Sequence, residues 1–306
     1  MTNTPARNLN GWKPERVDHR DRLLSLAPAT QLPRMVDLSP RCPPVEDQGP
    51  IGSCTAHAGT SAMEFVGGLG PEREAFLNLS RLFLYAETRL LEGTPLDNDA
   101  GATIRGTVKA LAKHGCPPEA LWPYLTTKFS VLPPRSVAEA ATQHRALEYF
   151  ACPSINEVKA SLAAGFPVLY GFSVPEHMMS ERVTVTGRID VPGPKEPIVG
   201  GHAVLAVGYN DDTGELKFMN SWGAGWGSHG FGYMPFEYFY VTETGALADD
   251  AWTIRAAGAP PAPKPLPADV RLAAAEALIG MLNPTDPADK VMRGALVAYA
   301  ASRAPR

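Results

Sequence analysis

The first part of the chain carries apolar residues in patterns that are typical of helices. Residues 54–66 are almost all small or apolar, which suits a buried helix, and Ser53 just before them is a common N-cap residue. Residues 80–91 repeat apolar positions every three or four places. A third helix is expected at residues 104–114, where Gly115 would end it. The sequence therefore predicts a helical half before about residue 145.

The pattern changes after residue 145. Short segments rich in β-branched and aromatic residues are bounded by Gly, Pro, Asn and Asp, as in AGFPVLYGFSV, GGHAVLAVGYN, ELKFMNSWG and GFGYMPFEYF. Such segments are typical of strands separated by turns. Helices followed by strands indicate an α+β protein, with a helical half (about 37–145), a β-barrel half (about 146–255) and a cleft between them.

Both ends of the chain lack the helix patterns followed by strand patterns that mark the central domain. Residues 1–36 are polar and interrupted by proline, which suits an extended segment across the surface. Residues 256–267, AAGAPPAPKPLP, are typical of an extended linker. Helical patterns at 268–282 and 286–301 are divided by NPTD, so residues 268–306 are expected to form a helical hairpin. The hairpin either binds a partner or packs on the domain.

Composition narrows the classes of function. The 306 residues are 44% hydrophobic and 20% charged, with a formal net charge of −4, which is ordinary for a globular protein. This charge gives no reason to expect a nucleic acid or an anionic membrane as a partner. No apolar run approaches the roughly 18 residues of a membrane span, and the N-terminus lacks the apolar core of a secretory signal. We expect a cytoplasmic protein.

The four cysteines are Cys42, Cys54, Cys116 and Cys152, and no two form a CxxC pair. Structural zinc sites usually use such close pairs, so neither a metal nor any other cofactor is expected. Mostly reduced thiols are predicted, with three cysteines packed as small apolar residues. A Cys42–Cys116 bridge stays open as an alternative.

The fourth cysteine has the surroundings that sulfur-based acyl transfer requires. Cys54 would stand at the start of a helix, where exposed N–H groups and the helix dipole favour a thiolate. Its own N–H would face the same space as a donor to an oxyanion. Such a site also needs a histidine as base, and a group that holds the histidine.

Three segments in order resemble the papain family of cysteine peptidases. DQGPIGSCTAHA is similar to its nucleophile segment, with Gln48 six residues before Cys54. GGHAVLAVGY is similar to its histidine strand, and NSWGAGWGSHGFGYMP to its Asn-Ser-Trp-Gly segment. His202 follows Cys54 by 148 residues, and Asn220 follows His202 by 18. The resemblance implies Cys54 as nucleophile, His202 as base, Asn220 as its orienting group, Gln48 as second oxyanion donor and Trp222 as a shield of the His–Asn bond.

The resemblance covers about residues 35–255 and is strongest to the bacterial branch typified by xylellain. That branch has GSCT, and an N-terminal Gly-Trp-x-Pro…Asp-His-Arg-Asp segment. Ile51 stands where better-known members have a disulfide cysteine, and Thr55 where they have tryptophan. About 31 residues precede Leu32, near which mature chains of the family start, so no helical propeptide is expected. Neither substitution removes a catalytic group.

One other histidine competes for the role of base. His57 lies one helical turn after Cys54. At this spacing it would point along the same helix and away from the far wall of the cleft, so we favour His202.

Substrate-binding residues also follow from the resemblance. DNDAGATIRG occupies the place of the family's glycine loop, so Gly101, with Ala100 and Ala102, would pair with an extended substrate. Thr103, Ala203 and Tyr238 would line a largely apolar pocket that prefers an apolar P2 residue. Tyr238 has an alternative role in closing the barrel.

The expected function is therefore a cysteine endopeptidase that acts on peptide or protein substrates through a Cys54 thioester. A catalytically silent binding protein on the same fold, and a transpeptidase or amidase, are the alternatives. Residues 1–36 are expected to lie over the cleft and restrain activity; a purely stabilising segment is the alternative.

Overall fold

The computed structural model describes residues 7–15, 18–25, 31–68, 77–240 and 245–258, together with Ile279, Met292 and Val297. Residues 1–260 form one unit and residues 261–306 a second. The predicted hairpin at 268–306 and most of the linker lie outside the described residues; the three single residues described there are helical.

The helical half contains the three predicted helices and a fourth, short one. They are α1 (Cys54–Gly67), α2 (Arg81–Leu91), α3 (Ile104–Lys113) and α4 (Arg135–Ala141). Hydroxyl groups cap two of them, because the Ser80 side chain accepts a hydrogen bond from the Phe83 N–H and the Thr103 side chain from the Gly106 N–H. These caps explain why α2 and α3 begin where they do.

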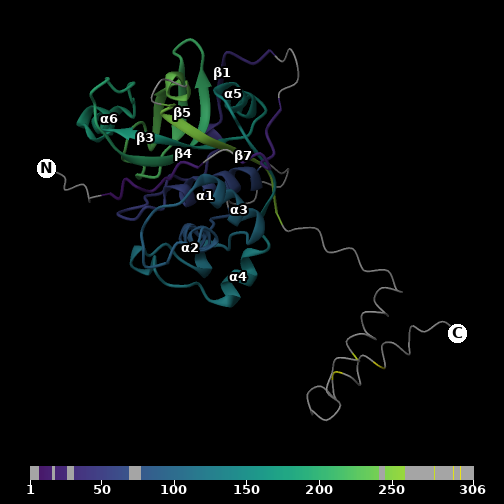
Figure 1. The fold of residues 1–306 in the computed structure, drawn as a ribbon. Coiled ribbons are helices and arrows are strands. Elements are labelled where there is room, and N and C mark those ends of the chain that lie inside the picture. Colours follow the sequence, from purple (N-terminus) through teal and green to yellow (C-terminus); the bar gives the residue numbers. More distant parts are fainter. Residues whose placement is uncertain are drawn as a thin grey trace. The chain divides into compact units, whose positions relative to one another are not determined.

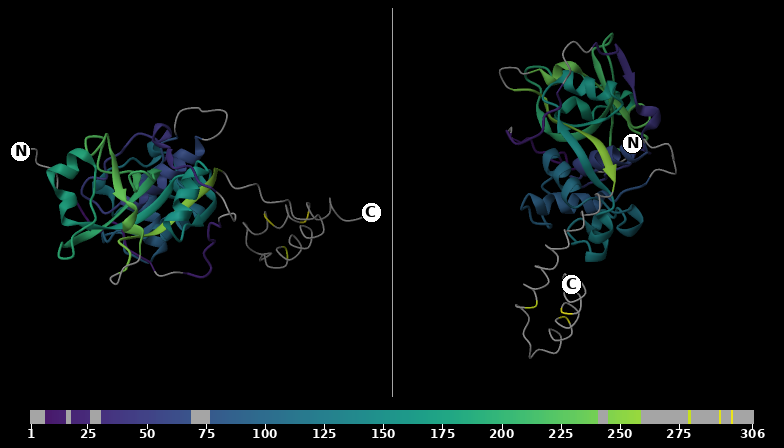
Figure 2. Two further views of the ribbon diagram at one scale, coloured as in Figure 1. Left: turned by 90° about the horizontal axis from the view of Figure 1, so that it is seen from above. Right: turned by 90° about the vertical axis from the view of Figure 1, so that its right-hand side faces the viewer.

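The other half is a seven-stranded antiparallel sheet (Figures 1 and 2). Its strand order is β2-β7-β3-β4-β5-β6, and β1 lies off this path, where it pairs with β4. The strands are β1 (Met35–Asp37), β2 (Arg145–Ala151), β3 (Val168–Pro175), β4 (Ile198–Asn210), β5 (Glu215–Met219), β6 (Phe231–Pro235) and β7 (Ala248–Gly258), with two short helices, α5 (Ile155–Ala163) and α6 (Glu181–Thr186). The α+β prediction is confirmed.

Two predicted boundaries shift. The linker was expected from Ala256, but β7 continues to Gly258, which pairs with Arg145 of β2. The backbone of Ala256 and Ala257 thus completes a strand pair. At the other end, β1 begins at Met35, inside the predicted N-terminal segment, because residues 35–37 pair with residues 208–210 of β4.

Helix α1 lies between the two halves and sets the position of the site. It contacts α2 and α3 on one side and β3, β4 and β7 on the other (Figure 1). All of its residues from Cys54 to Val66 are buried, as expected for a helix that is small and apolar around its whole circumference. Cys54, its first residue, therefore lies where the helical half meets the sheet.

Candidate active site

Cys54 is the first residue of α1, at the end of the helix where the backbone N–H groups have no partner within the helix, and its side chain is completely buried. The predicted N-cap, Ser53, precedes it but does not cap the helix: its φ and ψ are −96° and 18°, and its hydroxyl lies 2.6 Å from the Tyr124 hydroxyl. The first-turn N–H groups are therefore left near the sulfur. The Ala203 N–H donates to Cys54 Sγ over 3.4 Å. Burial raises the pKa of the Cys54 thiol to about 12, although the backbone N–H groups of Ala203, Thr55 and Cys54 act to lower it.

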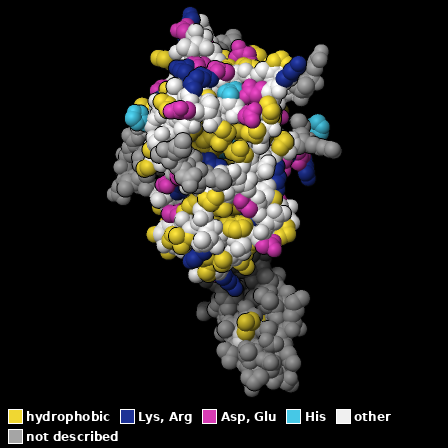
Figure 3. All heavy atoms as spheres, turned by 90° about the vertical axis from the view of Figure 1, so that its left-hand side faces the viewer, with side chains coloured by type: hydrophobic (Ala, Val, Ile, Leu, Met, Phe, Trp, Pro, Cys, Tyr) yellow, Lys and Arg dark blue, Asp and Glu magenta, His cyan; other side chains and the backbone are white. Residues whose placement is uncertain are grey.

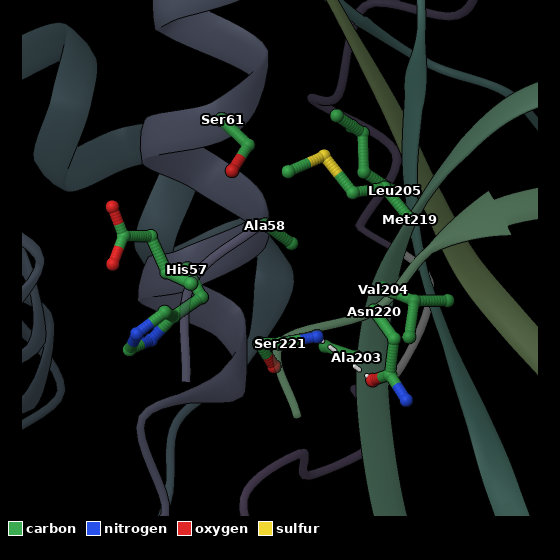
Figure 4. A pocket seen from close by; sticks show the side chains of 10 residues that line it. His57, Ala58, Ser61, Ala203, Val204, Leu205, Met219, Asn220 and Ser221 are labelled. Carbon is green, nitrogen blue, oxygen red and sulfur yellow. Dashed lines mark hydrogen bonds between the residues drawn. The ribbon is translucent and has the colours of Figure 1, made fainter. Parts of the chain in front are cut away.

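The imidazole of His202 is held from one side by Asn220. His202 Nε2 lies 2.8 Å from Asn220 Oδ1. The same oxygen accepts the Ser221 N–H over 2.8 Å, which is the bond drawn between these two residues in Figure 4. Two donors at one oxygen fix the orientation of the amide, so Nε2 carries the proton and Nδ1 keeps its lone pair. Burial lowers the pKa of His202 to about 4, while the Asn220 bond acts to raise it.

Trp222 covers this histidine as expected. The two ring centroids are 4.9 Å apart with an interplanar angle of 33°, and the indole is 5% exposed. Trp222 thus keeps bulk water away from the His202–Asn220 hydrogen bond. The bond is stronger in this shielded, low-dielectric surrounding than it would be in water.

Gln48 is buried next to the same loop. Its Oε1 accepts a hydrogen bond from the Ser221 hydroxyl (2.7 Å), and its Nε2 donates to the Ile51 carbonyl (3.0 Å). The amide orientation is fixed by this pair of bonds, and one N–H of Nε2 stays outside them. The segment before Cys54 and the one after β5 are thereby joined.

His57 points away from these groups. Figure 4 shows its side chain on one flank of α1, while Ala58 faces the sheet. His57 Nδ1 lies 3.1 Å from the Ser53 carbonyl oxygen, and its ring makes an edge contact with Tyr124. Burial, with Arg81 as a second cause, lowers the pKa of His57 to about 3, so it is a neutral structural residue.

An N-terminal stretch, residues 7–13, lies directly over Cys54; we call it the covering segment. Its backbone pairs with both walls of the cleft. Gly201 N donates to the Leu9 carbonyl (2.7 Å) and Trp12 N to the Gly201 carbonyl (3.2 Å), while Ala102 N donates to the Gly11 carbonyl (3.0 Å) and Lys13 N to the Ala102 carbonyl (3.1 Å). A Cβ atom on Gly11 would come 2.5 Å from Cys54 Sγ, so no larger residue fits there without movement.

The profile of the papain family of cysteine proteases matches residues 32–239. The chain belongs to the papain family. It is therefore a cysteine peptidase, a hydrolase that acts on peptide substrates. The predicted family and fold are confirmed.

Individual relatives agree with this assignment. A peptidase C1-like protein of Acanthamoeba polyphaga mimivirus is 39% identical over 218 residues, which is 68% of either chain. Xylellain, a cysteine protease from Xylella fastidiosa, is 35% identical, with a TM-score of 0.74 over 82% of this chain and 97% of that one. A procathepsin B of Trypanosoma congolense shares the fold, at 15% identity and a TM-score of 0.64 over 82% of this chain and 87% of that one.

Of the residues expected to bind substrate, Gly101 and Ala102 of one loop lie against the covering segment. Ala102 is the residue that pairs with the covering segment, and Gly101, at φ +69°, lets it approach because a Cβ there would lie 2.2 Å from the Asn10 carbonyl oxygen. Ala100 borders this loop. Thr103 caps α3, and its hydroxyl donates to Glu92 Oε1.

Tyr238 lies in the core of the sheet half. Its side chain is fully buried, its ring centroid is 6.3 Å from that of Phe172, and its hydroxyl donates to the Asp190 carbonyl. These contacts fit its alternative role within the sheet half, and the expectation that Tyr238 lines the substrate pocket stays a prediction. Ala203 stays beside the sulfur through its N–H.

Two aspartates near the site were missed. Asp99 accepts hydrogen bonds from Gly52 N (3.0 Å), the Tyr85 hydroxyl (2.6 Å) and Asn8 Nδ2 (2.7 Å). Asp250 accepts one from the Trp12 indole (3.4 Å). Asp99 stands in the DNDAGAT loop that the sequence singled out, whereas nothing in the sequence distinguished Asp250 from its neighbour Asp249.

The cysteines form no disulfide bond. All four cysteines are free; Cys42 Sγ donates to the Leu38 carbonyl and Cys116 Sγ to the Ser80 carbonyl, so the Cys42–Cys116 bridge is not formed.

Among the described residues, no group of three His, Cys, Asp or Glu side chains could hold a metal ion, and no helix is long and apolar enough to cross a membrane. On the face in Figure 3, charges of both signs are mixed with apolar side chains.

Proposed function

We propose that the protein is a cysteine endopeptidase in which Cys54, His202, Asn220 and Gln48 carry the reaction. His202 Nδ1 takes the proton of the Cys54 thiol, and the thiolate attacks the scissile carbonyl carbon. His202 then gives this proton to the leaving amine as the C–N bond breaks. Water, deprotonated by the same nitrogen, attacks the thioester and releases the acid and the free thiol.

Hydrogen bonds support the roles of His202 and Gln48. The Asn220 bond to Nε2 leaves Nδ1 as the basic nitrogen, which is the state that the first step needs. The unused N–H of Gln48 and the Cys54 N–H are the two donors proposed for the oxyanion. The fixed orientation of the Gln48 amide supports this, since a preorganised donor needs no rearrangement during the reaction.

The covering segment is proposed to hold this enzyme in a latent state. The observation that carries the proposal is the position of Gly11 against Cys54 Sγ, with the backbone of residues 9–13 paired to both cleft walls. An extended substrate needs the same backbone groups of Ala102 that the covering segment occupies. The raised pKa of Cys54 and the lowered pKa of His202 also favour the neutral, unreactive pair under this cover.

The stabilising role weighed as the alternative fits a different part of the N-terminal segment. Arg105 of α3 forms ion pairs with Glu15 (2.7 Å) and Asp21 (2.8 Å). Leu24 N donates to the Ala151 carbonyl, and Ala151 N to the Arg22 carbonyl. We propose that Glu15 and residues 21–24 anchor the segment to the domain while residues 7–13 restrain activity.

The test combines active-site labelling with removal of the cover. An epoxide inhibitor of papain-like enzymes is expected to alkylate Cys54, located by mass spectrometry, and to leave a Cys54→Ala variant unmodified. A chain that starts at residue 15 keeps the anchoring residues, and it is expected to label faster and to cleave a dipeptidyl fluorogenic substrate faster. Equal rates in the full and the shortened chain would reject latency, and absence of labelling in both would reject the catalytic assignment.

A further inference from the structure

Trp12 of the covering segment fills a side pocket of the cleft. Its side chain is 8% exposed and lies against two glycines, since a Cβ on Gly171 would meet the indole at 2.0 Å and one on Gly201 would meet it at 3.0 Å. The peptide groups on either side of Trp12 are those that pair with Ala102, and the preceding residue, Gly11, covers the sulfur. The pocket thus receives the side chain next to the residue over Cys54.

A carboxylate closes this pocket. Asp250 Oδ2 accepts the Trp12 indole N–H (3.4 Å), and Asp250 Oδ1 accepts the indole N–H of Trp252 (3.0 Å). Both donors are neutral. Desolvation raises the pKa of Asp250 to about 6, so the charged form lacks adequate compensation in the covered state.

A positive charge that acts to lower the pKa of Asp250, that of Arg105, is itself paired with other carboxylates. Arg105 lies over the Trp252 ring, 5.9 Å from its centroid, but its guanidinium is paired with Glu15 and Asp21. Glu15 adds negative charge near Asp250. When Trp12 leaves, Asp250 loses one of its two donors and faces an empty pocket.

We propose that Asp250 is a specificity-determining residue and that this pocket takes a lysine or arginine side chain of the peptide substrate. The inference rests on the proposed peptidase activity and names its substrate class. The glycine walls accept the aliphatic stem of such a side chain, and its charged head reaches the carboxylate. The head group of Lys or Arg lies farther from its Cα than an indole N–H does, so the reach suffices. The expected preference for a wholly apolar P2 residue is replaced by one for an apolar stem with a cationic end.

The experiment uses the full chain with Gly11→Ala, which loosens the cover, and compares substrates that differ only at P2. The substrates are dipeptidyl coumarin amides with the same P1 residue. One pair carries Arg or Leu at P2, the other carries Lys or norleucine, and kcat/KM is measured for each. Asp250→Asn keeps the shape and tolerates the observed φ of 57°, because Asn adopts this region as readily as Asp. Asp249→Asn, an exposed carboxylate one residue away, is the matched control, and Asp250→Glu keeps the charge.

The kcat/KM of the Arg and Lys substrates is expected to exceed that of their apolar partners by about tenfold or more, and Asp250→Asn is expected to bring the Arg-to-Leu ratio of kcat/KM close to one. A change in the open fraction cancels in this ratio. Asp249→Asn should change neither rate, and Asp250→Glu should keep part of the lead. An equal loss for all substrates in Asp250→Asn, or a lead of the Leu substrate in the parent, would overturn the proposal.

Binding separates this inference from the catalytic one. The same peptides, as uncleaved amides, are titrated calorimetrically into a chain with Gly11→Ala and Cys54→Ala. Tighter binding of the Arg peptide that disappears with Asp250→Asn supports the pocket assignment even if no variant turns over, in which case only the proposed activity fails. Equal affinities for Arg and Leu peptides would refute the pocket assignment even in an active enzyme.

Discussion

Gly11→Ala is the smallest change that tests whether the covering segment controls access to Cys54. The added methyl carbon would lie 2.5 Å from Cys54 Sγ and 3.3 Å from the Gly52 backbone, whereas ordinary contacts start at 3.4 Å. The sulfur belongs to a short, fully buried side chain, and the second contact is to backbone. The segment must therefore move outward by roughly the missing 0.9 Å or leave the cleft.

The size of the effect follows from the cost of such overpacking. One extra methyl group in a well-packed site costs about 1–3 kcal/mol, and here only the covered state bears that cost. A bias of this size changes the ratio of open to covered molecules by about 5–150-fold. Because activity is proportional to the open fraction while that fraction is small, kcat/KM should rise by the same factor.

The assay is hydrolysis of a dipeptidyl fluorogenic substrate by the full-length chain, with the concentration of reactive Cys54 determined by epoxide titration. Gly193→Ala is the matched control, because a Cβ at that exposed loop position meets nothing within 4 Å. A Gly11→Ala rate that equals or falls below the parent rate, at equal Cys54 content and melting temperature, would refute control by this contact.

Four further outcomes are expected. Asn220→Ala should lower kcat by about 10²-fold or more with little change in KM, since His202 loses the acceptor that fixes its basic nitrogen; steady-state kinetics of the Gly11→Ala chain would show it, and an unchanged kcat would contradict it. His57→Ala should cost about 2–4 kcal/mol in free energy of unfolding, measured with urea, because it empties a buried site, and the protein that stays folded should keep its kcat. Arg7 pairs with Asp47 (2.7 Å) and lies over Trp222, so Arg7→Ala should activate by about 2–10-fold, and 1 M salt should reduce the difference from the parent. With its pKa raised to about 12, the covered Cys54 should react with iodoacetamide only slowly at pH 7 and faster as the pH rises, whereas Gly11→Ala should react quickly at pH 7; identical pH–rate curves would contradict the reasoning.

The helices were predictable because their signals are local. Small and apolar residues along residues 54–66 indicated a helix buried on all sides, and Gly115 ended α3 at a φ of +80°. Motif order predicted that Cys54, His202 and Asn220 act together, and this stays a prediction. Their geometry needed the structure, since it depends on how β4 and the loop after β5 meet the start of α1.

Other features depend on contacts between distant segments and left little trace in the sequence. Ser53 has the right type for an N-cap, but Tyr124 takes its hydroxyl. Tyr238 stands in an aromatic cluster that suits a pocket wall as well as a core, and its packing against Phe172 could not be predicted from that cluster. The register that brings Trp12 over Asp250 joins residues 238 positions apart, which no local pattern encodes.

The hydrogen bonds around Asp99 have a practical consequence for handling the enzyme. Asp99 ties Gly52, two residues before Cys54, to Tyr85 of α2 and to Asn8, and this tie contains no sulfur. All four cysteines are free as well. Thiol reductants, which protect Cys54 from oxidation, therefore have no bond to break in the scaffold. The protein should melt at the same temperature with and without dithiothreitol, and the reductant dose can be set by the needs of Cys54 alone.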